Sequence, residues 1–333
     1  MTFFISLSKL RFVAVAVAAF LSGAIASPLL ASSALAPVTL QPGQQITIVA
    51  ANLPTPTTAP TVATTPAAAP AAAPTATPTP AVVADATPSA AVSSATTDPA
   101  AMPTSSLPGW NLIWADDFNT WNSTNYFAYP VGWHDTTGRG SYTPSIMSAS
   151  GGNLNIAIQT VNGVHEVAAF CPLLPGSLSA AGHNRGDLLG MRYSFRIRAD
   201  ALSGYKGVPL LWPQSELWPQ AGEVDGPESD FTTQPAAFIH HQNGTSSSDQ
   251  DYYLSPSGTN WQAWHTYTVE WVPGTRVDMW IDGTQWVHDT TRIPSTAMHL
   301  VMQFETSTTG SAPSNSTAGQ VQIAWLAAWA VAH

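Results

Sequence analysis

The sequence has few charged residues and a single cysteine. Asp, Glu, Lys and Arg make up 9% of the 333 residues, and 20 acidic against 10 basic residues give a formal net charge of −10. This charge repels phosphate backbones and offers little to polyanions, so it argues against nucleic acid and against sulfated or phosphorylated substrates. Since Cys171 is alone, no intrachain disulfide can form, and the fold must depend on its core.

Aromatic residues are absent from residues 37–107, where thirteen prolines stand among alanine and threonine. A segment of this composition cannot bury enough apolar area to offset the entropy cost of ordering it. We therefore expect residues 27–107 to be a disordered linker. All 13 Trp and the whole net charge lie beyond residue 108, so residues 108–333 are predicted to be the folded domain.

The N-terminus has the features of a secretory signal. Lys9 and Arg11 precede an apolar run, residues 12–26, that ends in an Ala24-Ile25-Ala26 cleavage site. The run is short for a bilayer span, so we expect residues 1–26 to be removed and the protein to be secreted, extracellular or periplasmic, without a membrane anchor. The alternatives are an uncleaved anchor and a later cut after Ala34-Leu35-Ala36, which Pro37 disfavours.

The C-terminal block is rich in strand patterns. Apolar and polar residues alternate in residues 153–158, 191–198 and 266–271, and residues 277–281 and 284–288 flank the turn Asp282-Gly283, which is typical of a hairpin. No stretch beyond residue 108 has a capped helical pattern. Many short strands in this length predict an all-β fold, a two-sheet antiparallel β-sandwich or jelly roll.

Three carboxylates stand close together after a Trp- and Pro-rich stretch, in Trp218-Pro-Gln-Ala-Gly-Glu223-Val-Asp225-Gly-Pro-Glu228. Glu223 and Asp225 share one face of a strand, but Glu228 joins them only if one extra residue forms a β-bulge. Gly226-Pro227 lies where such a bulge is needed.

Two such Glu residues fit glycoside hydrolysis with retention, in which one carboxylate attacks and the other donates and accepts a proton. Close carboxylates also separate their proton affinities. The alternatives are a solvated acidic face or a calcium loop, and the flanking Trp and Pro argue against the solvated face.

The chain resembles glycoside hydrolase family sixteen, the laminarinases and lichenases of the concanavalin A-like sandwich fold. The resemblance rests on the W-P-x-x-G-E-x-D-x-x-E stretch, on Trp114-Ala-Asp-Asp-Phe118, and on Trp264-His-Thr-Tyr-Thr-Val-Glu-Trp271 followed by Asp282-Gly283. It covers about residues 109–331.

The resemblance implies that Glu223 is the nucleophile, Glu228 the acid/base, and Asp225 a hydrogen-bond partner of the nucleophile. It suggests Trp212 and Trp218 as sugar platforms, and the weaker substrate-binding candidates are His240, Arg196 and Glu305. Many members carry a calcium-binding Asp just before the Trp of the last strand, where this chain has Ala324, so we expect no metal. We also expect no cofactor, a monomer, and a neutral polysaccharide as partner.

The leading hypothesis is an endo-acting hydrolase of β-1,3- or mixed β-1,3/1,4-glucans. A transglycosylase would share the covalent intermediate, a lectin on the same sandwich would not need the three carboxylates, and a cell-surface structural protein would explain only the linker. Members of the family also cut agarose, carrageenan and bacterial exopolysaccharides, so the sequence does not identify the glycan.

The signal gives a first prediction. Because cleavage is expected after Ala26, mass spectrometry of the exported protein should find a first residue at Ser27. An intact Met1 on membrane-bound protein would contradict removal of the signal.

Overall fold

The computed structural model describes residues 98–178 and 185–332. The predicted secretory signal, residues 1–26, and residues 27–97 of the predicted linker lie outside the described residues. Within the described ranges, no helix is long and apolar enough to cross a membrane.

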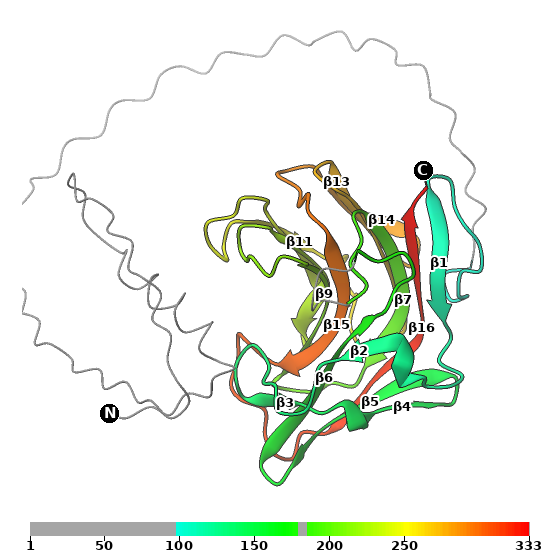
Figure 1. Cartoon of the computed structure of the whole chain (residues 1–333). Helices are drawn as coiled ribbons and strands as arrows, with labels where there is room; N and C mark the ends of the chain where they lie inside the picture. Colours follow the sequence, from blue (N-terminus) through cyan, green and yellow to red (C-terminus); the bar gives the residue numbers. More distant parts are fainter. Residues whose placement is uncertain (1–97, 179–184, 333) are drawn as a thin grey trace, which may run out of the picture. The chain divides into compact units, whose positions relative to one another are not determined.

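The strands form two curved layers, with β9, β11 and β15 in one and β1, β7 and β16 in the other (Figure 1). Sheet A contains β1 (Trp110–Asp116), β4 (Met147–Ser150), β5 (Asn153–Val161), β7 (Met191–Ala199), β12 (His265–Val272), β13 (Arg276–Ile281), β14 (Thr284–Asp289) and β16 (Gly319–Val331). Sheet B contains β2 (Tyr126–Ala128), β6 (Val164–Pro172), β8 (Tyr205–Pro213), β9 (Glu223–Asp230), β10 (Ala236–His240), β11 (Gln250–Leu254) and β15 (Met298–Thr306).

The two sheets are connected at one margin through the β5–β6 hairpin, where the short strand β3 (Gly140–Tyr142) also pairs with β6. The β3–β6 pair is parallel, whereas the strands of sheets A and B pair with their neighbours in antiparallel fashion. The predicted two-sheet antiparallel sandwich of jelly-roll type is confirmed.

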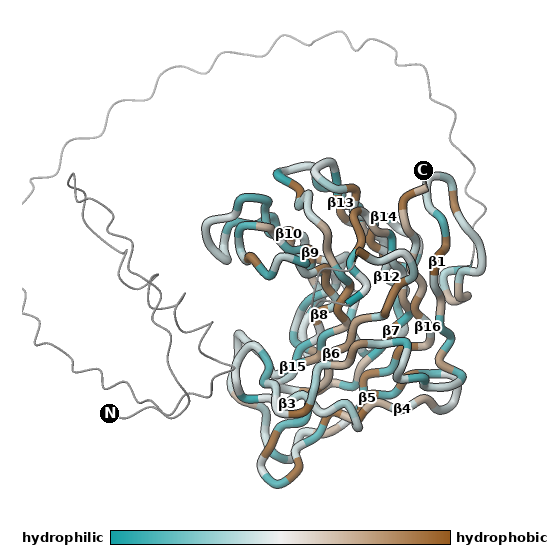
Figure 2. Tube along the Cα trace, viewed as in Figure 1, coloured by the Kyte–Doolittle hydropathy of each residue, from teal (hydrophilic) through white to brown (hydrophobic). Residues whose placement is uncertain are grey.

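Period-two alternation explains how the strands bury one face between the sheets. In β7, Tyr193, Phe195 and Ile197 are buried, and arginines stand on the other face. Phe195 stacks against Tyr193 and against Tyr267 of the neighbouring β12, with ring centroids 6.0 and 5.8 Å apart. Figure 2 shows the hydropathy of each residue along the chain, with hydrophobic positions recurring in the strands of both layers.

The predicted hairpin is present as β13 and β14. Asp282 and Gly283 both have positive φ, 49° and 81°, which is the backbone of the tight two-residue turn that an Asp-Gly pair favours. The described residues contain no α-helix, only the 3-10 turns η2 (Ser123–Asn125) and η3 (Pro144–Ile146). The absence of a helical pattern in the sequence is therefore matched by the described part of the chain.

Residues 98–107, which the sequence assigns to the linker, are bound to sheet A. The Trp325 indole donates to the carbonyl of Ala100 at 3.0 Å, the Trp329 indole donates to the carbonyl of Ser105 at 3.2 Å, and the Thr266 hydroxyl donates to the carbonyl of Pro99. These three acceptors are backbone carbonyls, and the one strap side chain that adds a bond is the Ser106 hydroxyl, which accepts the Leu112 N–H at 3.0 Å. The attachment therefore leaves little pattern in the sequence of the strap. We name residues 98–107 the strap.

The strap gives a second prediction. A chain that begins at Asp98 should keep the melting temperature of the longer protein, whereas one that begins at Pro108 loses at least the three hydrogen bonds to the indoles and Thr266. Such a loss is worth roughly 2–4 kcal/mol in total, or roughly 5–15 °C for a domain of this size. Thermal unfolding of the two chains measures the difference. Equal melting temperatures would mean that the strap does not stabilise the domain and belongs to the linker, as the sequence predicts.

Candidate functional site

Strand β9 carries the three carboxylates, and its pairing shows how they come to share one face. On β10, Ala236, Phe238 and His240 are two residues apart, and they pair with Glu228, Asp225 and Glu223 in that order. Between Asp225 and Glu228 the strand therefore contains one residue more than its partner, and the register with β8 shifts at the same place. This is the predicted bulge.

Two glycines allow this backbone path. A Cβ on Gly226 would lie 2.6 Å from Sδ of Met279 in the opposite sheet. Gly222, directly before Glu223, has φ +74°, and a Cβ there would lie 2.6 Å from the carbonyl oxygen of His240. Both positions therefore favour glycine, one through close packing and the other through a left-handed backbone as well.

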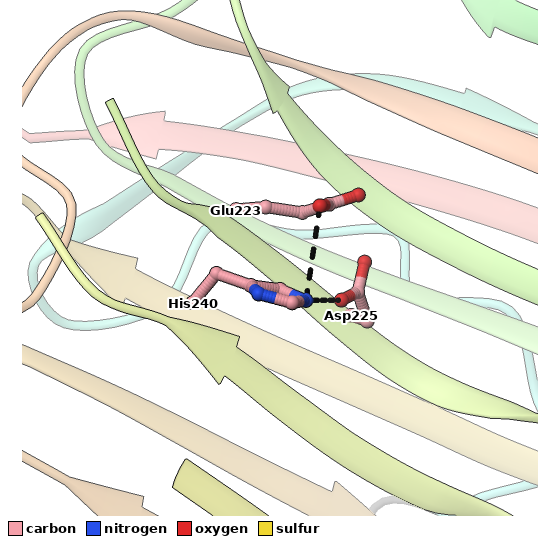
Figure 3. A group of neighbouring side chains, drawn as sticks. All are labelled: Glu223, Asp225 and His240. Atoms are coloured by element: carbon pink, nitrogen blue, oxygen red, sulfur yellow. Dashed lines mark ion pairs between the residues drawn. The ribbon is translucent and has the colours of Figure 1, made fainter. Parts of the chain in front are cut away.

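Glu223, Asp225 and His240 form one contact group (Figure 3). His240 Nε2 lies 3.3 Å from Asp225 Oδ2 and 3.9 Å from Glu223 Oε2. Both carboxyl groups are buried, with 8% of Glu223 and 2% of Asp225 exposed. His240, a weaker candidate in the sequence, is brought directly to the carboxylates by its register opposite Glu223.

Burial raises the pKa of both Glu223 and Asp225 well above the usual range of a carboxyl group. The negative charge of Asp225 raises the pKa of Glu223 further, and the negative charge of Glu228 does the same for Asp225. Glu223 Oε2 and Asp225 Oδ2 approach the same His240 nitrogen, and at this separation the two negative charges disfavour ionisation of both carboxyl groups. The two groups therefore titrate as a pair.

The two predicted platforms lie on one side of this group. The rings of Trp212 and Trp218 stack with centroids 6.3 Å apart and planes 17° apart, and Trp218 meets the His240 ring at 5.7 Å. The Trp212 indole donates to Glu216 at 2.7 Å, and Arg185 pairs with the same carboxylate at 2.7 Å. The structure thus brings both tryptophans next to the carboxylates.

On the other side, Lys206 of β8 contacts Glu228. Its ammonium is paired with Oε1 of Glu228 and lies 3.5 Å from Oε1 of Glu305. Glu305, on β15, is directly opposite Lys206 in the register. The candidate Glu305 is therefore brought to the site, but through Lys206 rather than by direct contact with the carboxylates of β9.

A pocket of about 430 Å³ opens beside this ion pair. Lys206 and Glu228 form part of its wall, and an aromatic pair, Phe238 and Tyr252, lines it with ring centroids 5.2 Å apart. Tyr252 is 54% exposed. A half-open pocket with an aromatic wall and a few polar groups is the kind of surface that holds a sugar ring.

Arg196 is not part of this group. It belongs to β7 in sheet A, and its neighbours Phe195 and Ile197 occupy the core, so the side chain points away from sheet B. Its guanidinium donates to the Thr266 hydroxyl at 3.2 Å and lies over the ring of Trp264. The proposal that Arg196 binds substrate is therefore withdrawn, because the alternation of β7 sends it to the outer face.

Sequence reasoning missed Lys206, Phe238 and Tyr252. Lys206 had a signal, since it is the only lysine after Lys9 and stands among apolar residues in Tyr205-Lys-Gly-Val-Pro-Leu-Leu. A charge in such a strand must find a buried partner. Phe238 and Tyr252 carried no signal, because only the pairing of β10 with β11 sets them side by side.

The contact group has a spacing that a cation could occupy, since the donor atoms of Glu223, Asp225 and His240 lie within 4.8 Å of one another. A cation there would have to replace the proton that burial favours on these carboxyl groups. At the calcium position suggested by the resemblance, Ala324 lies at a register shift of β16 and has no oxygen in its side chain. Residue 324 therefore cannot supply a side-chain ligand to a calcium ion.

The fold is that of known glycoside hydrolases. A non-specific endo-β-1,3(4)-glucanase of family GH16 matches with a TM-score of 0.55 and 15% identity over 69% of this chain and 95% of its own. The laminarinase of Rhodothermus marinus matches with a TM-score of 0.55 and 19% identity over 67% and 98%. An endo-acting O-glycanase structure from work on mucin breakdown by human gut microbiota matches with a TM-score of 0.52 and 13% identity over 67% and 100%.

No protein-family model matches the chain, and no curated protein matches it either. The structural likeness therefore shows a shared sandwich fold, and the chemistry has to be argued from the site itself.

The raised pKa values give a third prediction. A carboxyl group whose pKa is higher in the folded than in the unfolded protein costs stability as pH rises above about 4, because the unfolded chain ionises first. Glu223→Gln removes this cost, so the variant should melt higher than the wild type at pH 8, with a difference that shrinks toward pH 4. The gain in melting temperature should be largest at pH 8 and vanish near pH 4, because it follows the ionisation of Glu223.

Differential scanning calorimetry across this pH range measures the effect. Glu166→Gln is the matched control, since Glu166 is bonded to Gln159 on β5, outside the contact group. A gain for Glu223→Gln that does not change with pH would rule out the ionisation of Glu223 as its cause.

Proposed function

We propose that the protein is an endo-acting glycoside hydrolase of family sixteen that cleaves neutral β-glucans, β-1,3- or mixed β-1,3/1,4-linked, with retention of configuration. The observation that carries this proposal is the bulge of β9, which turns Glu228 onto the face of Glu223 and Asp225. Nothing in sheet pairing requires three carboxylates on one face of a mostly buried strand. Their grouping is, however, what a double displacement needs.

In the first step, a carboxylate oxygen of Glu223 attacks the anomeric carbon, and the bond from that carbon to the glycosidic oxygen breaks. Glu228 gives its proton to the departing oxygen, so the leaving glycan is released as an alcohol. Asp225, whose pKa is raised by burial, carries a proton beside Glu223, and His240 Nε2 lies 3.3 Å from Asp225 Oδ2. The product of this step is a glycosyl ester of Glu223.

In the second step, the ionised Glu228 takes a proton from water, and the water oxygen attacks the anomeric carbon. Glu223 leaves with the electron pair of the ester bond, and Glu228 is protonated again. Two inversions at one carbon give the retained configuration. The stacked rings of Trp212 and Trp218 lie next to the nucleophile and offer flat apolar surfaces to the bound sugar.

The proposed substrate is a neutral glucan because the chain has a net charge of −10 and the site is itself acidic. The structures of similar fold include endo-β-glucanases and a mucin O-glycanase, so a mucin-type O-glycan is the second candidate. We further propose that the enzyme acts outside the cytoplasm, as the N-terminal signal suggests, and that it is a monomer.

Rescue by small anions gives a fourth prediction. Glu223→Ala leaves a cavity at the nucleophile, so azide or formate should restore turnover of an aryl β-glucoside oligomer and give a product of inverted configuration. Glu228→Ala keeps its nucleophile, and with a leaving group that needs no proton it should accumulate the glycosyl ester. Azide should then release a product of retained configuration. Without rescue, each variant should lose at least about a hundredfold in kcat.

Proton NMR of the first-formed anomer reads the configuration, and Glu166→Ala serves as the control carboxylate. A first-formed α-anomer from the wild type on a β-glucan would mean inversion and would overturn the role of Glu223. Binding of laminarin or lichenan without any cleavage by the wild type would favour a lectin.

A further inference from the structure

Lys206 is a buried cation in a place where stability does not require one. It lies in the middle of sheet B, and 7% of its side chain is exposed. An ammonium group loses several kcal/mol on leaving water, and a well-packed apolar residue generally serves the fold as well or better. Its contacts with Glu228, with Glu305 and with the Thr308 hydroxyl at 3.4 Å connect it to the proposed acid/base.

Glu305 is held rigidly from behind. It is 1% exposed, and its Oε2 accepts the backbone N–H of Thr136 at 3.1 Å. The next residue, Thr306, gives its N–H and its hydroxyl to Asp135 at 2.9 and 2.6 Å. The loop after β2 therefore holds the Glu305 carboxylate in place. Glu305 in turn orients the ammonium of Lys206, which orients one oxygen of Glu228.

The ammonium also counters an excess of negative charge around Glu228. The groups that face this carboxyl are Glu223, Asp225 and Asp230 on β9, Glu305 on β15, His240 on β10 and Lys206 on β8. Burial lowers the pKa of Lys206, but the carboxylates of Glu228 and Glu305 outweigh burial and raise it, so the side chain stays charged over the working pH range.

We propose that Lys206, held by Glu305, is the positioning residue of Glu228 and that its charge sets the upper pH limit of turnover. The inference rests on the proposed function. The basic limb of the pH profile marks the loss of the proton that Glu228 must donate. A cation in contact favours the ionised carboxylate, so Lys206 brings this limb to lower pH.

The test measures kcat/KM against pH for two variants that change the charge in opposite directions. Lys206→Met removes the cation, and its basic limb should move up by about one pH unit or more, with a fall in kcat of roughly tenfold or more from lost positioning. Lys206→Arg should keep the limb near that of the wild type. Glu305→Gln removes the second carboxylate from the ammonium, so the basic limb of this variant should move to lower pH.

Arg276→Met is the matched control, because Arg276 pairs with Glu270 and Asp278 in sheet A. Its limb should not move. Melting curves establish that each variant is folded, and Lys206→Arg and Glu305→Gln still decide the question if Lys206→Met does not fold. A basic limb that stays in place in the folded charge-changing variants would overturn the proposal.

A second measurement does not depend on turnover. In protein labelled with ¹³C at the glutamate carboxyl carbons, the Glu228 signal is identified by its loss in Glu228→Gln, and its titration midpoint is followed in the wild type and in Lys206→Met. If the midpoint is higher in Lys206→Met but the wild type cleaves no glycan, the proposed function is wrong and the electrostatic role of Lys206 stands. An unchanged midpoint would remove that role, whatever the enzyme cleaves.

Discussion

The site depends on one extra residue in β9. Without it, the period of two would send Glu228 toward sheet A, where Val224, Leu211 and Ile239 fill the core. The bulge turns the carboxylate outward while the strand keeps its pairing with β8 and β10 on both sides of the shift. The two strands thus act as a rigid frame, and the position of Glu228 relative to Glu223 is fixed by the backbone instead of by a flexible loop.

Burial of the carboxylates has a cost that the neighbouring groups only partly offset. Glu223 and Asp225 lie against His240, and burial favours a proton on them, whereas Glu228 is paired with the ammonium of Lys206. The arrangement separates the three acids into a buried pair and an ion pair. The proposed roles therefore require a proton to move within the group, because Glu223 must be ionised to attack and Glu228 must be protonated to donate.

The sequence predicts more of the fold than of the site. The alternation in β7 and the Asp282-Gly283 turn depend on neighbouring residues in the chain, so the strands, the hairpin and the sandwich could be read from it. The bulge was predictable for the same reason, because the misfit of Glu228 and the Gly-Pro pair are local. The attachment of the strap was not, since it uses backbone carbonyls that any residue could supply.

The site residues that escaped prediction, or were wrongly included, depend on which strands are neighbours. His240 reaches the carboxylates because β10 pairs with β9 in one register, and Glu305 meets Lys206 because β15 pairs with β8 in another. Arg196 alternates with apolar residues, as a substrate-binding arginine on a strand of the site would, but its strand belongs to the other sheet. Residue chemistry alone cannot separate these cases, because pairing between distant strands decides which face of which sheet a side chain occupies.

The choice of glycan is decided at the margins of the site and not at the carboxylates. Structures of this fold act on targets as different as β-glucans and mucin, at nearly equal likeness to this chain, so the shared sandwich does not select a sugar. In this chain the margins are the stacked Trp212 and Trp218 on one side and the pocket lined by Phe238 and Tyr252 on the other. Because Lys206 forms part of that pocket wall while its charge is already occupied by Glu228 and Glu305, the pocket offers no free positive charge from Lys206 to an anionic sugar. This wall is therefore consistent with the neutral glycan that we propose as substrate, since a neutral sugar ring needs apolar faces and a few hydrogen bonds.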